Sequence, residues 1–335
     1  MMRFLVVCLL VFCSMPAFAS ITEYVVKQWN IQNGLPSQSL KSIAQDEQGY
    51  MWLGTQFGLS RFDGNTFTNF NTQNSDFLPS NGINKLLVDS TGLLWVGTKN
   101  GLVTLDPKTM MSQTFNVKGP VRDILEDSKG SIWIAANGLY YVARNQVTLN
   151  QNSALIVPVS NATAITQIVG SVSQMALSPE GIWLVNERHL LRLTNTSSDF
   201  AKLRLELTAK VSLPERLAQT IIHDMAWLEG NLYLASELGA YFLDLDDELR
   251  PFPLPNASNS AVYKFMSDSD GALWISTYGR LLFRDNSGDW QWVEPSQLDQ
   301  SIWFADIFRD NQNNIWLASF SEGLWLAHEG RIERH

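Results

Sequence analysis

The chain contains very little cysteine. Only two of its 335 residues are cysteines, Cys8 and Cys13, and both lie in the opening segment MMRFLVVCLLVFCSMPAFAS. The remainder therefore cannot form an internal disulfide, and its stability must come from packing. Because 45% of the residues are hydrophobic, the chain can fill the core of one large domain or of two ordinary ones.

Long hydrophobic runs are also scarce. The run Phe4–Cys13 is too short to span a bilayer, and no later stretch is long and apolar enough to do so. It follows the positive Arg3 and precedes Ala17-Phe18-Ala19, which is the pattern of a secretory signal peptide. We therefore expect residues 1–19 to be a signal peptide cleaved after Ala19 and residues 20–335 to be exported. The alternative is a retained membrane anchor.

Positive charge is in deficit. The sequence has 24 Lys and Arg against 33 Asp and Glu, a net charge of −9 that becomes −10 once Arg3 is removed. This balance disfavours binding to nucleic acid or to an anionic membrane surface.

Residues for metal or cofactor chemistry are sparse as well. The four histidines, His189, His223, His328 and His335, do not have the spacing of metal ligands. The acidic pairs Asp46–Glu47 and Asp268–Asp270 have too few oxygen ligands nearby for Ca²⁺ and indicate solvated turns. With no G-x-S-x-G motif and no phosphate-binding loop, we expect no metal, no cofactor and no catalytic residue.

What the sequence does contain is a repeat. The stretch DEQGYMWLGTQFGLSRFDG, residues 46–64, returns in seven versions spaced by roughly 40–50 residues, the range of β-propeller blades. The aromatic residues that mark the copies are Trp52, Trp95, Trp133, Trp183, Tyr233, Trp274 and Trp316. The fold class is therefore all-β, a seven-bladed propeller of four-stranded antiparallel blades.

The repeated residues indicate structure rather than chemistry. Aspartate can hydrogen-bond its own turn and glycine can adopt positive φ, so each D-x-x-G is a hairpin turn. The clearest copies are Asp46 with Gly49, Asp89 with Gly92, and Asp127 with Gly130. Since the aromatics occupy equivalent positions, we expect all seven to be wedges between neighbouring blades.

The last blade can be completed in two ways. Residues Glu23–Trp29 resemble a fourth strand without a blade of its own, which predicts that the N-terminal strand closes the ring. The rival is Arg331–His335, at the place of the last copy's own fourth strand. The long gaps at 151–170 and 194–216 are polar and are predicted to be loops.

Candidate binding residues lie where the copies differ. The position five residues before the turn aspartate falls near the start of each first strand, and in a propeller this strand lines the central channel. The seven rim positions are Lys41, Asn84, Arg122, Ser173, His223, Tyr263 and Ala305. Their mixed donors and acceptors suit a polar small ligand such as a sugar, although a solvated rim without a ligand is the alternative.

The repeated D-x-x-G-x-x-W-x-G-T-x-x-G-L-x-x-[FL]-D resembles the two-component regulator propeller repeat, and residues 33–64 resemble that family's first repeat. The resemblance implies the periplasmic sensor domain of a hybrid histidine kinase or diguanylate cyclase. It also implies a second propeller or a homodimer partner, and an output domain beyond His335, so that this chain would be part of a longer sensor.

Two other functions stay open. An exported propeller enzyme acting on polysaccharide, a lyase or glycosidase, would need charged residues converging at one channel mouth. The turn motif of sialidase-type propellers places Asp five residues before Trp, whereas Asp46 is six before Trp52. An envelope scaffold would instead need a broad apolar face.

Overall fold

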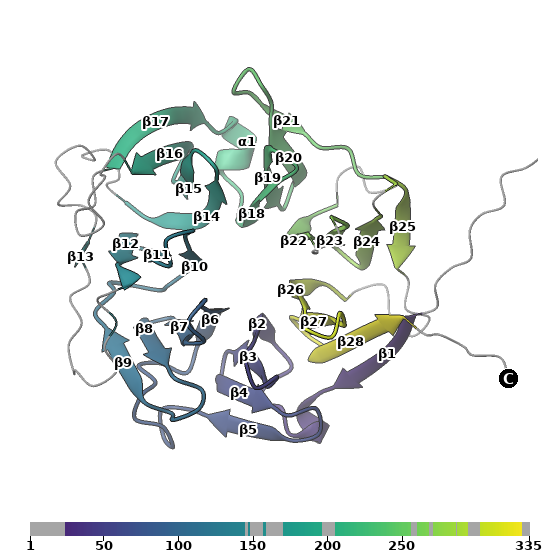
Figure 1. The fold of residues 1–335 in the computed structure, drawn as a ribbon. Coiled ribbons are helices and arrows are strands. Elements are labelled where there is room, and N and C mark those ends of the chain that lie inside the picture. Colours follow the sequence, from purple (N-terminus) through teal and green to yellow (C-terminus); the bar gives the residue numbers. More distant parts are fainter. Residues whose placement is uncertain are drawn as a thin grey trace, which may run out of the picture.

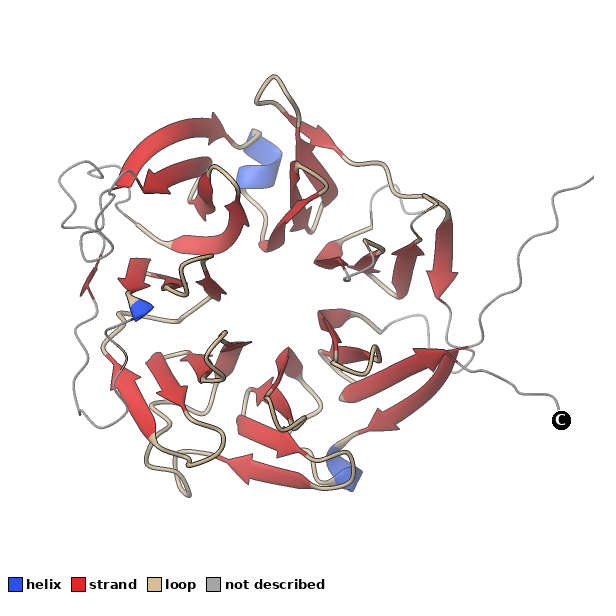
Figure 2. Ribbon diagram, viewed as in Figure 1, coloured by secondary structure: helices blue, strands red, loops and turns tan. Residues whose placement is uncertain are grey.

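The computed structural model describes residues 24–144, 147, 157–158, 170–195, 205–255, 260–267, 271–285, 287–293 and 302–329. Their strands form seven four-stranded antiparallel sheets arranged in a ring, as Figures 1 and 2 show. The predicted seven-bladed β-propeller is therefore confirmed.

Each blade runs outward from the central channel, with its first strand innermost (Figure 1). Blade 1 is β2 (Leu40–Gln45), β3 (Met51–Thr55), β4 (Gly58–Phe62) and β5 (Phe67–Phe70). Blade 2 is β6 (Ile83–Val88), β7 (Leu94–Thr98), β8 (Gly101–Leu105) and β9 (Ser112–Phe115). Blade 3 is β10 (Asp123–Glu126), β11 (Ile132–Ala136), β12 (Gly138–Val142) and β13 (Val157–Pro158).

The remaining blades follow the same order. Blade 4 is β14 (Val172–Ser178), β15 (Gly181–Asn186), β16 (His189–Asn195) and β17 (Leu205–Ser212). Blade 5 is β18 (Ile222–Leu228), β19 (Asn231–Ser236), β20 (Gly239–Leu243) and β21 (Leu249–Pro251). Blade 6 is β22 (Val262–Ser267), β23 (Leu273–Thr277), β24 (Arg280–Arg284) and β25 (Trp290–Val293). Blade 7 is β26 (Phe304–Arg309), β27 (Ile315–Ser319), β28 (Leu324–Glu329) and β1 (Tyr24–Trp29).

The N-terminal strand closes the ring. β1 pairs antiparallel with β28, from Tyr24 opposite Glu329 to Trp29 opposite Leu324. The prediction that the N-terminal strand completes the last blade is confirmed, with the strand beginning one residue after Glu23. The rival segment Arg331–His335 lies outside the described residues, as does the predicted signal peptide.

The loop prediction for residues 194–216 was wrong. β17 occupies most of this gap as the fourth strand of blade 4, and the short helix α1 (Glu215–Ala218) follows it. Exposed residues alternate with more buried ones along β17, the period of a half-buried strand. Leu205, Leu207, Ala209 and Val211 carry that alternation in the sequence. In the other gap, β13 is the fourth strand of blade 3.

Seven hydrophobic clusters lie between neighbouring blades, and each contains one motif aromatic. Trp52 of blade 1 packs with Ile83 and Leu86 of blade 2, and Trp316 of blade 7 packs with Leu40 and Ile43 of blade 1. All seven aromatics are at most 7% exposed. The other five clusters contain Trp95, Trp133, Trp183, Tyr233 and Trp274. Burying apolar surface at every blade junction stabilises the ring as one body.

The turn aspartate is bonded to this aromatic. In blade 1, one oxygen of Asp46 accepts the backbone N–H groups of Gln48 and Tyr50, and the other accepts the indole N–H of Trp52 at 2.8 Å. The same indole–carboxylate bond joins Trp95 to Asp89 (2.7 Å), Trp133 to Asp127 (3.0 Å) and Trp316 to Asp310 (2.7 Å).

The turn glycines take the positive φ that the motif requires. Gly49, Gly92 and Gly130 have φ of 89°, 83° and 75°, and Asn313, which replaces the glycine in the last copy, has φ of 67°.

Candidate ligand-binding site in the central channel

The rim positions lie at irregularities in the first strands. Pairing of the first strand with the second shifts register across Lys41, Asn84, Ser173, His223, Tyr263 and Ala305. An extra residue at such a β-bulge leaves the ladder and its side chain is re-aimed. In blade 3, Arg122 precedes β10 and its N–H donates to the carbonyl of Ala135. The bulges thus release these side chains from the sheet at the channel mouth.

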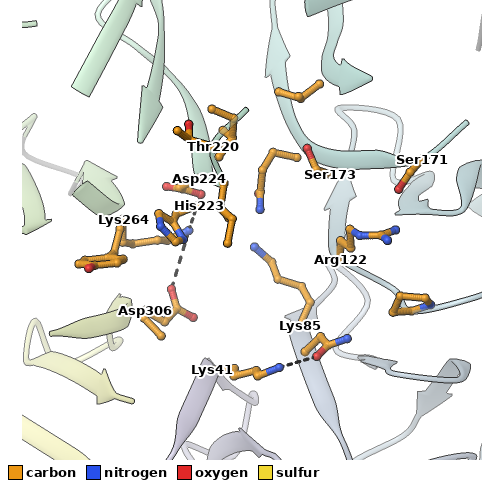
Figure 3. A pocket seen from close by; sticks show the side chains of 18 of the residues that line it. Lys41, Lys85, Arg122, Ser171, Ser173, Thr220, His223, Asp224, Lys264 and Asp306 are labelled. Atoms are coloured by element: carbon orange, nitrogen blue, oxygen red, sulfur yellow. Dashed lines mark hydrogen bonds and ion pairs between the residues drawn. The ribbon is translucent and has the colours of Figure 1, made fainter. Parts of the chain in front are cut away.

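All seven rim positions line one cavity. Its volume is about 610 Å³, and its wall combines the first strands with other parts of the fold. These include the segment around α1, the residue Glu187 between β15 and β16, and Phe320 between β27 and β28. Figure 3 shows Lys41, Lys85 and Arg122 on one side of this cavity and His223, Asp224 and Lys264 across it. A cavity of this size holds a small ligand.

A second set of residues, called here the inner ring, follows the rim positions directly in sequence. Its members are Ser42, Lys85, Asp123, Gln174, Asp224, Lys264 and Asp306. All but Asp123 line the cavity. The sequence-based prediction did not include this ring, although every member is polar and directly follows a rim position.

Members of the inner ring in odd-numbered blades bond the next blade. Each accepts a hydrogen bond from a backbone N–H of the following first strand. The bonds are Leu86 to Ser42 (3.1 Å), Met175 to Asp123 (3.0 Å), Phe265 to Asp224 (3.0 Å) and Ile43 to Asp306 (2.9 Å). The even-numbered blades supply Lys85, Gln174 and Lys264. The ring therefore ties the blades together around the channel.

Two lysines neutralise the ring's carboxylates. Lys85 lies 2.9 Å from Asp123, and Lys264 lies 3.0 Å from Asp224 and 3.8 Å from Asp306. Burial lowers the pKa of Lys264, but the charges of Asp224 and Asp306 outweigh it and raise the pKa above its ordinary value. These three carboxylates are thus occupied by structural contacts.

His223 and Tyr263 face the cavity in a poorly solvated environment. Burial lowers the pKa of His223, which favours the neutral imidazole, and burial raises the pKa of Tyr263. The buried Nε2 of His223 has no hydrogen-bond partner in the described part of the chain. A buried polar atom without a partner is costly, so a ligand or water reaching it would be stabilised.

An aromatic series extends from His223 along the same side of the channel. Its ring lies 4.8 Å from that of Tyr263, which lies 4.6 Å from Trp303, and Trp303 stacks on Phe320 at 4.2 Å. Tyr263 and Phe320 line the cavity. Such a surface suits the apolar face of a ring.

The acidic turn residues and the histidines outside the cavity are described only in part. They contain no group of three His, Cys, Asp or Glu residues that could hold a metal ion. The carboxylate of Asp46 is engaged by its own turn and by Trp52, while Asp268, Asp270 and His335 lie outside the described residues. Within the described ranges, no helix is long and apolar enough to cross a membrane.

The ring of blades and the lined channel mouth define a β-propeller with a candidate small-molecule site. Three segments, 34–57, 78–100 and 256–279, match the model of the two component regulator propeller family. The chain therefore carries the repeats of the two component regulator propeller family. Histidine kinase P4 from Formosa agariphila is 36% identical over 58 residues, which is 17% of this chain and 4% of that protein.

Solved structures share the fold at low identity. The extracellular domain of the hybrid two component system BT3049 from B. thetaiotaomicron superposes with a TM-score of 0.69 and 17% identity, over 92% of this chain and 42% of that one. Virginiamycin B lyase from Staphylococcus aureus gives a TM-score of 0.65 and 15% identity, over 91% of this chain and 99% of the lyase. The chain thus spans less than half of the BT3049 domain.

Proposed function

We propose that the chain is the ligand-binding input module of a bacterial signalling receptor, located in the periplasm, and that it binds its ligand without converting it. The observation that carries this proposal is the convergence of all seven rim positions on one cavity of about 610 Å³. The wall also contains the imidazole of His223, whose buried Nε2 has no hydrogen-bond partner in the described part of the chain. The similarity to extracellular domains of two component systems supports the signalling role.

The ligand class that this wall suits is a small molecule with polar groups and a ring, such as a sugar. Donors and acceptors at Asn84, Ser173 and His223 would fix its orientation, and Tyr263 would pack on its ring. The remaining parts of the receptor would include a second propeller or a homodimer partner and a kinase or cyclase output.

A ligand screen tests the proposal. The thermal unfolding midpoint of the purified chain is measured with each member of a panel of mono- and oligosaccharides. The binding of each saccharide that raises this midpoint is then measured by calorimetry. We expect saturable binding that weakens at least about tenfold in His223→Ala and in Tyr263→Ala. His189→Ala, a histidine on β16 that does not line the cavity, is the matched control. Binding that is unaffected by both cavity variants would contradict the proposal.

The second candidate is a propeller enzyme, and the similarity to virginiamycin B lyase over nearly its whole length favours it. A neutral His223 at the cavity wall is the group that could accept a proton. Incubating each ligand found by the screen with stoichiometric protein and analysing the products by mass spectrometry separates the two candidates. Recovery of intact ligand supports the sensor, and catalytic turnover supports the enzyme.

A further inference from the structure

Uncompensated positive charge gathers on one side of the candidate site. Lys41, Lys99 and Arg122 come from blades 1, 2 and 3, and none of them forms an ion pair with another residue in the described part of the chain. This is unusual for a chain of net charge −9. Cations close together without a counter-charge are a place where an anion is stabilised.

Lys41 is the most constrained of the three. Its side chain is half-buried, and within the described residues its amine donates only to the neutral amide oxygen of Asn84, at 2.8 Å. Burial and then the charge of Lys99 lower its pKa. An anionic group beside the amine would offset both effects.

Two glycines leave room for side chains beside the other cations. A Cβ on Gly82 would lie 2.5 Å from Cδ of Lys99, so the absence of a side chain lets the lysine stem cross the backbone just before Asn84. A Cβ on Gly119 would lie 2.3 Å from Nδ2 of Asn137. The side-chain oxygen Oδ1 of Asn137 in turn accepts hydrogen bonds from both terminal nitrogens of Arg122, each at 3.4 Å.

The acidic residues of the cavity do not cancel this charge. Asp224 and Asp306 are paired with Lys264, as described above. Glu187 is the remaining carboxylate of the wall, and it belongs to blade 4, where its side chain lies over Gly170. The cations come from blades 1 to 3 and the aromatics from blades 5 to 7, and Figure 3 shows His223 on the opposite side of the cavity from Arg122.

We infer that the ligand of this site is a small anion, a carboxylate or similar group attached to a ring. The anionic group lies against Lys41 and Arg122, and the ring packs on Tyr263 and Phe320. This inference rests on the proposed function and names the class of ligand. A carboxylate on a sugar ring and a carboxylate on an aromatic ring share this chemistry.

The test uses two fluorescent probes that differ by one sulfonate group, the anion 1-anilinonaphthalene-8-sulfonate and the neutral N-phenyl-1-naphthylamine. We expect the sulfonate to bind the full chain at one saturable site, with a Kd about tenfold lower than that of the neutral probe. Raising the salt concentration should weaken only the sulfonate. Tyr263→Ala should weaken both probes.

Variants locate the charge effect. Lys41→Gln and Arg122→Gln should each remove most of the preference for the sulfonate, and Lys41→Arg should restore it, which excludes a folding defect as the cause. Lys210→Gln is the control, because Lys210 is exposed on the outer strand β17, away from the cavity. Displacement of the sulfonate by D-glucuronate or by benzoate, with D-glucose and benzyl alcohol as neutral partners, distinguishes the two ring types.

The outcomes separate the two proposals. If both probes bind equally in a manner that depends on Tyr263, the charge inference is overturned and the ligand site stands. If Lys210→Gln weakens the sulfonate as much as Lys41→Gln, the effect is general charge and the inference again falls. If neither probe binds in the cavity, the inference fails, and the saccharide screen alone decides the proposed function.

Discussion

The aspartate of the blade motif has a separate partner for each of its two oxygens. In Asp89, one oxygen accepts the N–H groups of Thr91 and Leu93 and so shapes the turn, while the other accepts the indole N–H of Trp95. The fourth copy shows the consequence of losing it. Ser178 takes the place of the aspartate in a hairpin that is one residue shorter, and its hydroxyl donates to the carbonyl of Gly181. The buried indole N–H of Trp183 has no partner in the described part of the chain.

Substitution of Asp89 by Asn tests this double role. The amide can keep the turn bonds, but its NH₂ group then faces the indole N–H, so we expect unfolding to require about 1–3 kcal/mol less. In a Trp95→Phe background the cost should be clearly smaller, because the second donor is absent. Urea unfolding of the four proteins measures this coupling. Asp76→Asn, at an exposed position, is the control, and equal costs in both backgrounds would contradict the shared bond.

Much of the blade structure could be predicted from the sequence because the sequence repeats. In each copy a turn precedes the motif aromatic and a strand follows it. The burial of the aromatic and its position in the blade could therefore be predicted in the same way for all seven copies. The rim positions followed in the same way from the geometry of the first strand. The β-bulges could not be predicted from the repeat, because Lys41, Asn84 and Tyr263 share no conformational preference that indicates a bulge.

Ring closure depends on a single strand, β1. Its Trp29 stacks on Trp316 of blade 7 at 5.6 Å and meets Phe62 of blade 1 edge-on at 5.1 Å. The side chain of Trp29 in the N-terminal strand therefore contacts both blade 7 and blade 1, the two blades that meet where the ring closes. Strand pairing with β28 supplies the main-chain bonds.

Replacing Trp29 by Ala should lower the free energy of unfolding by about 3–5 kcal/mol, the usual cost of deleting a buried aromatic side chain. Thermal unfolding followed by circular dichroism measures the loss. Thr68→Ala, at an exposed position on the outer strand β5, should change stability by no more than about 0.5 kcal/mol. A Trp29 variant as stable as this control would show that the ring does not depend on its N-terminal closure.

The inner ring couples all seven blades at once. Acceptors in the odd-numbered blades bond the next blade, and lysines in two of the even-numbered blades pair with their carboxylates. This arrangement depends on residues from blades far apart in sequence, such as Asp306 beside Ile43. It could not be predicted from any single repeat, since the partners come together only once the ring has closed.

Lys264 is the most connected member of the ring, and Lys264→Met tests the coupling. Its side chain is 18% exposed and lies between Asp224 and Asp306. Removing the cation leaves two carboxylates facing each other without a counter-charge, so we expect a loss of about 3–5 kcal/mol at pH 7. Lys210→Met, on the outer strand, should cost little, and a similar loss in both variants would contradict the role of the ring.

The pH dependence of that loss has a definite sign. The folded pKa of Lys264 lies above the ordinary value of 10.5, so its contribution is fully present below about pH 10.5 and is lost as the pH rises through the folded pKa. The difference in unfolding free energy between the native chain and Lys264→Met should therefore stay constant from pH 7 to 9.5 and shrink above 10.5. Urea titrations at pH 7, 9 and 11 measure it. A difference that grows with pH would mean that the lysine is held in its neutral form, and the ring would then not be ionic.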